Sequence, residues 1–286
     1  MSKYLIKGAS LYGEKVADLL IEDGVISRIA ENIDAADAQV VEAAGQVALP
    51  GLVDIHTHLR QPGYEASETV ETGTRAAALG GYTAVFAMAN SMPVADTAAV
   101  VEQVDRLGKE SAWCRVQPIG AVTVGLKGER LSDIGGMANS TANVRVFSDD
   151  GMCVYDPAVM RRALEYVKTF DGVIAQHAQE PRLTEGAQMN EGKVSADLGL
   201  AGWPAVAEEA IIARDVLLAE HLDSKLHICH LSTKGSIEVV RWAKSRGVKV
   251  TAEATPHHLL LTDETARTYD PVFKVNPPLR TEEDVM

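Results

Sequence analysis

The chain has 286 residues, 46% hydrophobic and 23% charged, a composition that excludes an intrinsically disordered protein. Its formal net charge is -13 and no run of Lys or Arg is dense, which excludes the basic surface of a nucleic-acid-binding protein. No apolar run reaches the length of about 18 residues typical of a membrane span, and the first residues, MSKYLIKGASLYGE, lack the basic segment and apolar core of a signal peptide, so we expect a soluble protein that is not exported. The three cysteines form no CxxC pair, and their odd number favours the reducing cytoplasm over a disulfide framework.

Residues 1–48 predict a small β-sheet domain. The stretches YLIKGASLY and VADLLIEDGVISRIA have the composition of short strands, and glycines and charged turns separate them. We expect this domain to be distinct from the larger one that follows in residues 49–286.

Residues 49–286 alternate between strand-like runs and segments of helical period, which predicts βα units and a parallel sheet. The expected helices include PAVMRRALEYVKTF and segments near 205–221 and 235–246. The seven strand candidates are LPGLVDIHTH, YTAVFAMAN, WCRVQPIGAVT, VRVFSDD, GVIAQHA, KLHICHLS and VKVTAEATPHH. Only PPLRTEEDVM follows Asn276, so we expect a (β/α)₈ TIM-type barrel that lacks its eighth strand.

The first of these strands carries the motif Asp54-x-His56-x-His58, and Arg60 continues its period of two. Side chains two apart on a strand share a face, so both imidazoles can reach one metal ion. Arg60 would place a cation beside that ion, where it can pair with a carboxylate of a substrate. The motif alone fits equally well two histidines that serve only in packing.

Polar residues recur where the later strands end, which is where parallel barrels carry their functional groups. These residues are Asn90, Asp149, Asp150, His177 and His230. Four histidines and a carboxylate pair at such positions favour metal binding over packing. Imidazole and carboxylate ligands suit Zn²⁺, with Mn²⁺, Co²⁺ and Fe²⁺ as alternatives.

Seven motifs, in this order, resemble those of the dihydroorotases of the bacterial barrel type, which belong to the cyclic amidohydrolase superfamily. They are GLVDIHTHLRQPG, MANSMPV, FSDDG, QHAQE, HICHLST, EATPHHLLL and NPPLR, and they span almost the whole chain. Each motif is weak by itself, and the set is specific.

The resemblance implies two metal ions, with zinc the expected metal. It assigns His56 and His58 to one ion and His177 and His230 to the other, with an aspartate of FSDDG bridging them. Asp150 is favoured as the bridge because the family places this ligand 27 residues before His177, and Asp149 remains the alternative. The implied substrate-binding residues are His58, Arg60, Asn90 and Asn276, although either asparagine also suits a simple turn before proline.

The implied function is the reversible hydrolysis of the cyclic amide of dihydroorotate to N-carbamoyl-aspartate in de novo pyrimidine biosynthesis. The metals would activate a water for attack on the ring amide carbon. A homodimer and an association with aspartate transcarbamoylase are the expected assemblies. Two alternatives remain: a hydantoinase or allantoinase, whose bridging carboxylated lysine has no counterpart in FSDDG, and a non-catalytic scaffold for aspartate transcarbamoylase.

The family pattern also requires a general-base aspartate on the eighth strand, which we expect beyond Met286. No catalytic base is therefore assigned within the chain, and we expect a fragment with low activity and exposed strand edges. Glu253, His257 and His258 are expected to support the site or to pack near it. Cys229 is expected to face away from its neighbour His230, as a small core residue.

Overall fold

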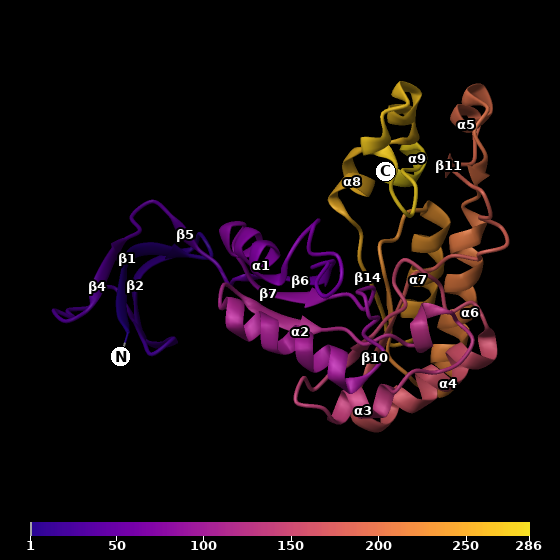
Figure 1. Cartoon of the computed structure of the whole chain (residues 1–286). Helices are drawn as coiled ribbons and strands as arrows, with labels where there is room; N and C mark the ends of the chain where they lie inside the picture. The colour runs from indigo at the N-terminus through magenta and orange to yellow at the C-terminus, as the bar shows by residue number, and fades with distance from the viewer. Residues whose placement is uncertain (1) are drawn as a thin grey trace. The chain divides into compact units, whose positions relative to one another are not determined.

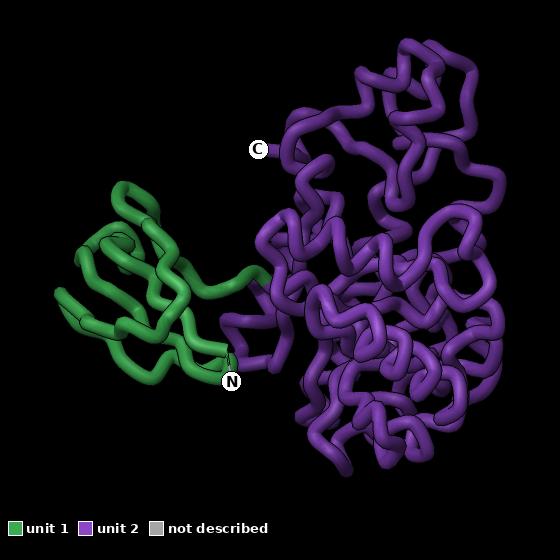
Figure 2. Tube along the Cα trace, turned by 60° about the vertical axis from the view of Figure 1, so that its left-hand side comes forward, with its two compact units in different colours: residues 1–52 green, residues 53–286 purple. Residues whose placement is uncertain are grey.

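Residues 2–286 are described here from a computed structural model, which divides into two compact units, Met1–Leu52 and Val53–Met286 (Figure 2). The first unit is a five-stranded sheet in the order β3-β2-β1-β4, in which β5 pairs with the far end of β1. Pairing is antiparallel for β1 with β2 and for β2 with β3, and parallel for β1 with β4 and β5. The strands are β1 (Lys3–Leu11), β2 (Lys15–Glu22), β3 (Val25–Ala30), β4 (Gln39–Glu42) and β5 (Val47–Ala48).

A buried carboxylate ties this small sheet to its loops. Asp18 is 3% exposed, and its two oxygens accept hydrogen bonds from the backbone N–H groups of Gly8 and Ile33, each at 2.9 Å. These two bonds hold the pKa of Asp18 below its usual range. Leu5 and Leu20 pack with Ile33 beside this carboxylate, so the sheet has a core of its own.

The second unit contains the seven barrel strands that the sequence predicts, all in consecutive order. Three form the sheet β6-β7-β8 and four form the sheet β9-β10-β13-β14. The strand pairs β7–β8, β9–β10, β10–β13 and β13–β14 are parallel. A parallel bridge between Gly120 and Phe147 connects the two sheets. The strands are β6 (Leu52–Thr57), β7 (Tyr82–Ala87), β8 (Arg115–Pro118), β9 (Val146–Phe147), β10 (Val173–Gln176), β13 (Leu226–Ile228) and β14 (Val250–Ala252).

Helices follow most of these strands and cover the outside of the curved sheet (Figure 1). Helix α4 begins where Asp156 caps two backbone N–H groups and Pro157 occupies the first turn, a combination that favours helix initiation. Helix α6 fills the predicted segment near 205–221, and α7 that near 235–246. The helices are α1 (Val70–Leu79), α2 (Ala98–Ser111), α3 (Ile134–Asn139), α4 (Pro157–Val167), α6 (Val206–Leu222) and α7 (Lys234–Ser245).

Short elements near the C-terminal ends of the strands form a lobe that the sequence does not predict. Strands β11 and β12 are two residues each and pair in parallel. Arg280, which is 1% exposed, joins this lobe by donating hydrogen bonds to Asn190, Trp203 and Ser232. The elements of the lobe are β11 (Met189–Asn190), α5 (Lys193–Leu198), β12 (Gly202–Trp203), α8 (Pro256–Leu260), α9 (Glu282–Val285) and the 3₁₀ turns η3 (Asp263–Thr268) and η4 (Pro271–Phe273). Two further 3₁₀ turns lie elsewhere: η1 (Val124–Leu126) in the loop after β8, and η2 (Lys168–Phe170) directly after α4.

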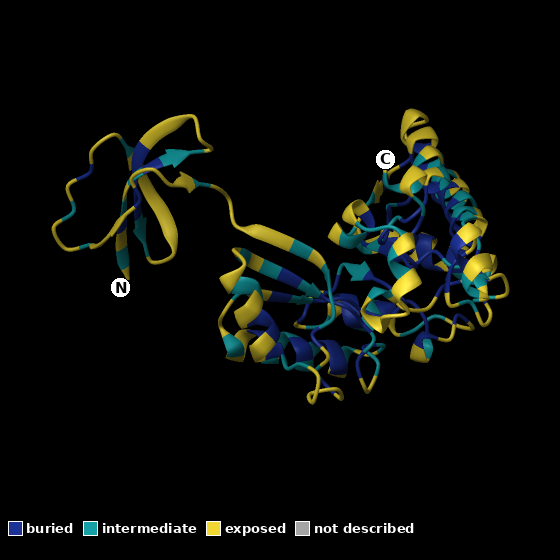
Figure 3. Cartoon of the chain, turned by 90° about the horizontal axis from the view of Figure 1, so that it is seen from above, coloured by how far each residue is buried: buried dark blue, intermediate teal, exposed yellow. Residues whose placement is uncertain are grey.

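Burial within the second unit is uneven. The largest apolar cluster joins β9, β10, β13 and β14 to α3, α4, α6 and α7. Strands β10 and β13 are mostly buried, whereas β6 is half-exposed along its length (Figure 3). Among the described residues, no helix combines the length and apolar character that a membrane span requires.

Candidate metal centre

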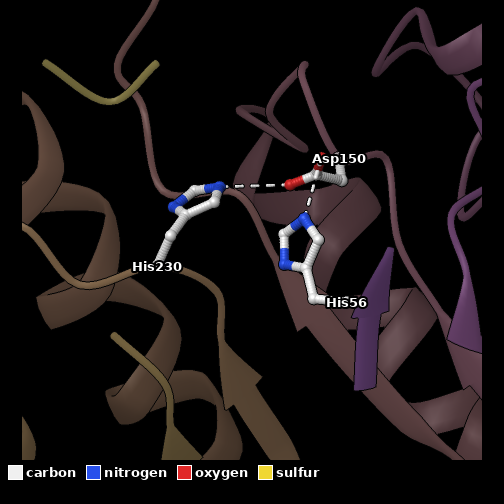
Figure 4. Close-up of side chains that lie close together, drawn as sticks. All are labelled: His56, Asp150 and His230. Carbon is white, nitrogen blue, oxygen red and sulfur yellow. Dashed lines mark hydrogen bonds and ion pairs between the residues drawn. The ribbon is translucent and has the colours of Figure 1, made fainter. Parts of the chain in front are cut away.

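Four histidines and one aspartate converge at the C-terminal ends of the barrel strands. His56 lies on β6 and His58 follows it, while His177 comes directly after β10 and His230 is the second residue after β13. Asp150 follows β9, where Gly151 adopts a φ of +84° that turns the chain immediately after the carboxylate. Figure 4 shows His56 and His230 reaching the Asp150 carboxylate, His56 from β6 and His230 from the loop after β13.

The two oxygens of Asp150 face different pairs of imidazoles. Its Oδ2 lies 3.3 Å from Nε2 of His56 and 3.3 Å from Nε2 of His58. Its Oδ1 lies 3.1 Å from Nε2 of His230 and 3.5 Å from Nδ1 of His177. One carboxylate therefore stands between two histidine pairs, the arrangement expected of a bridging ligand.

Hydrogen-bond acceptors on the far side of three imidazoles orient their rings. His56 Nδ1 lies 2.5 Å from Glu253 Oε1, and His58 Nδ1 lies 3.0 Å from Asn90 Oδ1. His177 Nε2 lies 2.9 Å from the side-chain oxygen of Gln179. Since each partner is an oxygen acceptor, each ring places an N–H there. His56 and His58 thereby direct the other nitrogen at Asp150, and His177 directs its Nδ1 at both Asp150 and Nε2 of His230, which is 2.9 Å away.

The neighbouring Asp149 has a different role. Its Oδ1 accepts hydrogen bonds from the backbone N–H groups of Val122 at 2.7 Å and Thr123 at 3.0 Å, and its Oδ2 accepts one from the Thr123 hydroxyl. The pKa of Asp149 is raised to about 6, because the effect of burial outweighs that of these hydrogen bonds, which favour the charged carboxylate. Asp149 anchors the loop after β8, and the geometry selects Asp150 as the carboxylate that contacts the histidines.

The electrostatics of the cluster reflect this crowding. Burial opposes ionisation of Asp150, but contacts with four imidazoles outweigh it and hold the pKa of this carboxyl well below its usual range. Burial likewise opposes the charged form of His56, while hydrogen bonds to Asp150, Cys229 and Glu253 raise its pKa to about 12. Burial lowers the pKa of His230. A negative carboxylate thus lies at the centre of the cluster.

A pocket of about 690 Å³ opens over these groups. Arg60 and Asn276 line it together with the histidines, and the Arg60 guanidinium makes no ion pair with any of residues 2–286. Arg60 adopts a φ of +59°, the left-handed region that non-glycine residues rarely occupy. The pocket therefore offers one unpaired cation beside the carboxylate–histidine cluster.

The chain matches a sequence profile described as dihydro-orotase-like over residues 45–236. It is 71% identical to a dihydroorotase of Streptomyces coelicolor over 286 residues, which are all of this chain and 67% of that protein. The chain belongs to the dihydro-orotase-like family. A dihydroorotase of Leifsonia xyli is 68% identical over 99% of this chain and 64% of its own length, and one of Mycobacterium tuberculosis is 54% identical over 99% and 66%.

The chain thus spans about two thirds of the length of these curated relatives. Among solved structures, an L-hydantoinase (dihydropyrimidinase) from Arthrobacter aurescens superposes with a TM-score of 0.85 at 22% identity, over 100% of this chain and 65% of its own. A D-hydantoinase superposes with a TM-score of 0.80 at 20% identity, over 99% and 64%. These likenesses show the fold, an α/β barrel preceded by a small β-sheet unit, and confirm the predicted fold class.

The donor atoms of this family member fit divalent metal ions. Tetrahedral coordination with bonds of about 2.0–2.1 Å separates neighbouring ligand atoms by roughly 3.3 Å. The distances from Asp150 Oδ2 to His56 and His58 are both 3.3 Å, and those from Oδ1 to His230 and His177 are 3.1 and 3.5 Å. His177 Nδ1 also lies 2.9 Å from His230 Nε2, and the donor atoms of His56, Asp150 and His230 all lie within 4.8 Å of one another. The described residues therefore contain a cluster whose donor types and spacing suit a divalent metal at Asp150.

Two residues of the centre, Cys229 and Gln179, were not predicted correctly from the sequence. Cys229 is buried as expected, but its sulfur lies within 4.8 Å of donor atoms of both His56 and Glu253, on the site side. Strand β13 ends at Ile228 and His230 has a φ of +34°, so strand alternation does not apply there. Gln179 was not predicted to contact His177, because a residue in a loop carries no periodic signal.

Proposed function

We propose that the protein is a dihydroorotase that uses two divalent ions, with zinc the expected metal. The observation that carries the proposal is the Asp150 carboxylate, whose oxygens each face one histidine pair at 3.1–3.5 Å. Sequence identity of 54–71% to proteins named dihydroorotase supports this activity over that of a hydantoinase or allantoinase.

In this proposal His56, His58 and Asp150 hold one ion, and His177, His230 and Asp150 hold the other. When bound, the ions would polarise the ring carbonyl and lower the pKa of a water that attacks it. Asp150 and Glu253 have both of their oxygens engaged by histidines, so neither is assigned as proton acceptor. Low turnover by the 286-residue chain therefore stays a prediction.

Arg60 would select the substrate. Dihydroorotate carries a carboxylate that hydantoin and allantoin lack, and a guanidinium without an ion-pair partner can bind it with two parallel hydrogen bonds. Asn90 and Asn276 are proposed to contact the polar ring groups, since both line the pocket. Asn90 also orients His58, so its oxygen serves the metal centre while its amide nitrogen is available to substrate.

Binding and turnover of dihydroorotate, hydantoin and allantoin by the metal-loaded chain test this proposal. We expect dihydroorotate to bind most tightly, and we expect Arg60→Ala to remove most of that preference while hydantoin binding stays unchanged. Preferential binding or hydrolysis of hydantoin or allantoin would overturn the proposal. A cytoplasmic location, a homodimer and an association with aspartate transcarbamoylase also stay predictions.

A further inference from the structure

Glu253 lies where the two ends of the barrel sheet face each other. Strands β6 and β14 occupy opposite ends of the strand order, and Glu253 is the first residue after β14. Its carboxylate nevertheless reaches His56 on β6, with 2.5 Å between Oε1 and Nδ1. A side-chain contact thus joins the first and last strands of the described sheet at the metal centre.

Both oxygens of this carboxylate are engaged. Oε1 also accepts a hydrogen bond of 3.3 Å from the backbone N–H of His230, and Oε2 lies 3.2 Å from Nε2 of His227. His227 is fixed in turn by Thr251, whose hydroxyl lies 2.8 Å from Nδ1 on the neighbouring strand. A chain of hydrogen bonds therefore runs from β14 through His227 and Glu253 to His56.

The backbone of Glu253 is equally well held. Its N–H donates to Ile228 at 3.1 Å, and its carbonyl accepts from the N–H of Leu231 at 2.8 Å. These bonds clamp Glu253 against the turn that carries His230 in its left-handed conformation. Because hydrogen bonds hold both its backbone and its carboxylate, Glu253 can fix the orientation of the His56 ring.

We propose that Glu253 is a positioning residue for the metal centre, holding His56 from behind and His230 through its backbone. Because a carboxylate only accepts hydrogen bonds, it keeps a proton on His56 Nδ1 and leaves Nε2 for a metal ion. The side-chain oxygens of Asn90 and Gln179, which are neutral amides, orient His58 and His177 in the same way. Glu253 supplies the only charged acceptor in this set, and its contact with β14 makes His56 dependent on the far end of the sheet.

This inference rests on the metal site proposed above, and cobalt binding tests the two separately. Wild-type chain, Glu253→Gln, Glu253→Ala and Glu102→Gln are each titrated with Co²⁺ against a competing chelator, and the visible absorption of the bound ions is recorded. Glu102 is a matched control, because its carboxylate ties Thr141 by bonds of 3.0 and 2.9 Å outside the centre.

We expect Glu253→Ala to weaken binding of the ion held by His56 by roughly 10–100-fold and to change its absorption spectrum, because Glu253 contacts the ring of His56 but only the backbone of His230. Glu253→Gln should show a smaller loss, because the amide oxygen still accepts from Nδ1–H, and Glu102→Gln should match wild type. Equal affinities and spectra for Glu253→Ala and wild type would overturn the positioning role. Failure of the wild-type chain to bind cobalt would instead overturn the metal site itself. Melting temperatures of the metal-free variants separate a folding defect from a loss of metal affinity.

Discussion

The two histidine pairs of the centre rest on differently supported halves of the barrel. His177 and His230 follow β10 and β13, which have neighbours on both sides and are almost entirely buried. His56 and His58 belong to β6, which ends the strand order and is half-exposed. Side-chain contacts orient rings in both pairs, through Gln179 for His177 and through Glu253 and Asn90 for the β6 pair, but only the His177–His230 pair also lies in the buried core. Similar ligands can therefore depend on different interactions.

Replacing the residue shared by both halves should have the largest effect. Asp150→Asn leaves one oxygen and places an NH₂ group toward one of the histidine pairs, so both ions lose the bridging charge. We expect metal content after chelator-free purification to fall from two ions per chain towards none, with loss of any hydrolysis. Retention of two ions by this variant would show that Asp150 is not the bridge.

Removing one histidine from each pair should show that the two pairs contribute differently to the stability of the chain. We expect His58→Ala and His230→Ala each to lose one ion, but only His230→Ala to lower the stability of the metal-free chain, by about 1–3 kcal/mol. The physical reason is burial, since the His230 side chain is 9% exposed and that of His58 27%. Metal analysis with urea unfolding checks this, and equal stability losses would remove the proposed asymmetry.

Asp149 offers a contrast between adjacent carboxylates. Asp149→Asn turns an amide donor towards the donors of Val122 or Thr123, so we expect a loss of about 1–3 kcal/mol in unfolding free energy. Metal content should stay at the wild-type level. If Asp149→Asn is as stable as wild type but lacks an ion, Asp149 and not Asp150 is the bridging ligand.

The last prediction concerns Asp215, a buried acid on α6 that accepts a hydrogen bond from Gln176 on β10. Burial raises its pKa from the ordinary value of 3.8 to about 6, although Arg214 and Gln176 oppose the shift. Its folded-state pKa lies above the unfolded one, so its contribution to stability is complete below about pH 4 and is lost as the pH rises through about 6. Melting of metal-free Asp215→Asn should therefore improve relative to wild type between pH 4.5 and 7.5. A difference that stays constant or reverses with pH would contradict this assignment.

The sequence predicts those parts of the molecule that periodicity governs. Alternation along strands and the parallel arrangement were enough to predict the seven barrel strands and the residues at their ends. Periodicity fails where the chain has left the strand: β9 ends at Phe147, so the alternation rule cannot choose between Asp149 and Asp150. The same limit explains why the sequence predicted the wrong orientation for Cys229, which lies one residue beyond β13. The lobe of β11, β12 and the 3₁₀ turns consists of elements too short to leave a periodic signal.

Anomalous diffraction from crystals of the zinc-loaded chain, recorded on both sides of the zinc absorption edge, would test the central claim most directly. We predict two peaks flanking Asp150, one between Oδ2 and the pair His56 and His58, and one between Oδ1 and the pair His177 and His230. Peaks elsewhere in the molecule, or none at this carboxylate, would contradict the account.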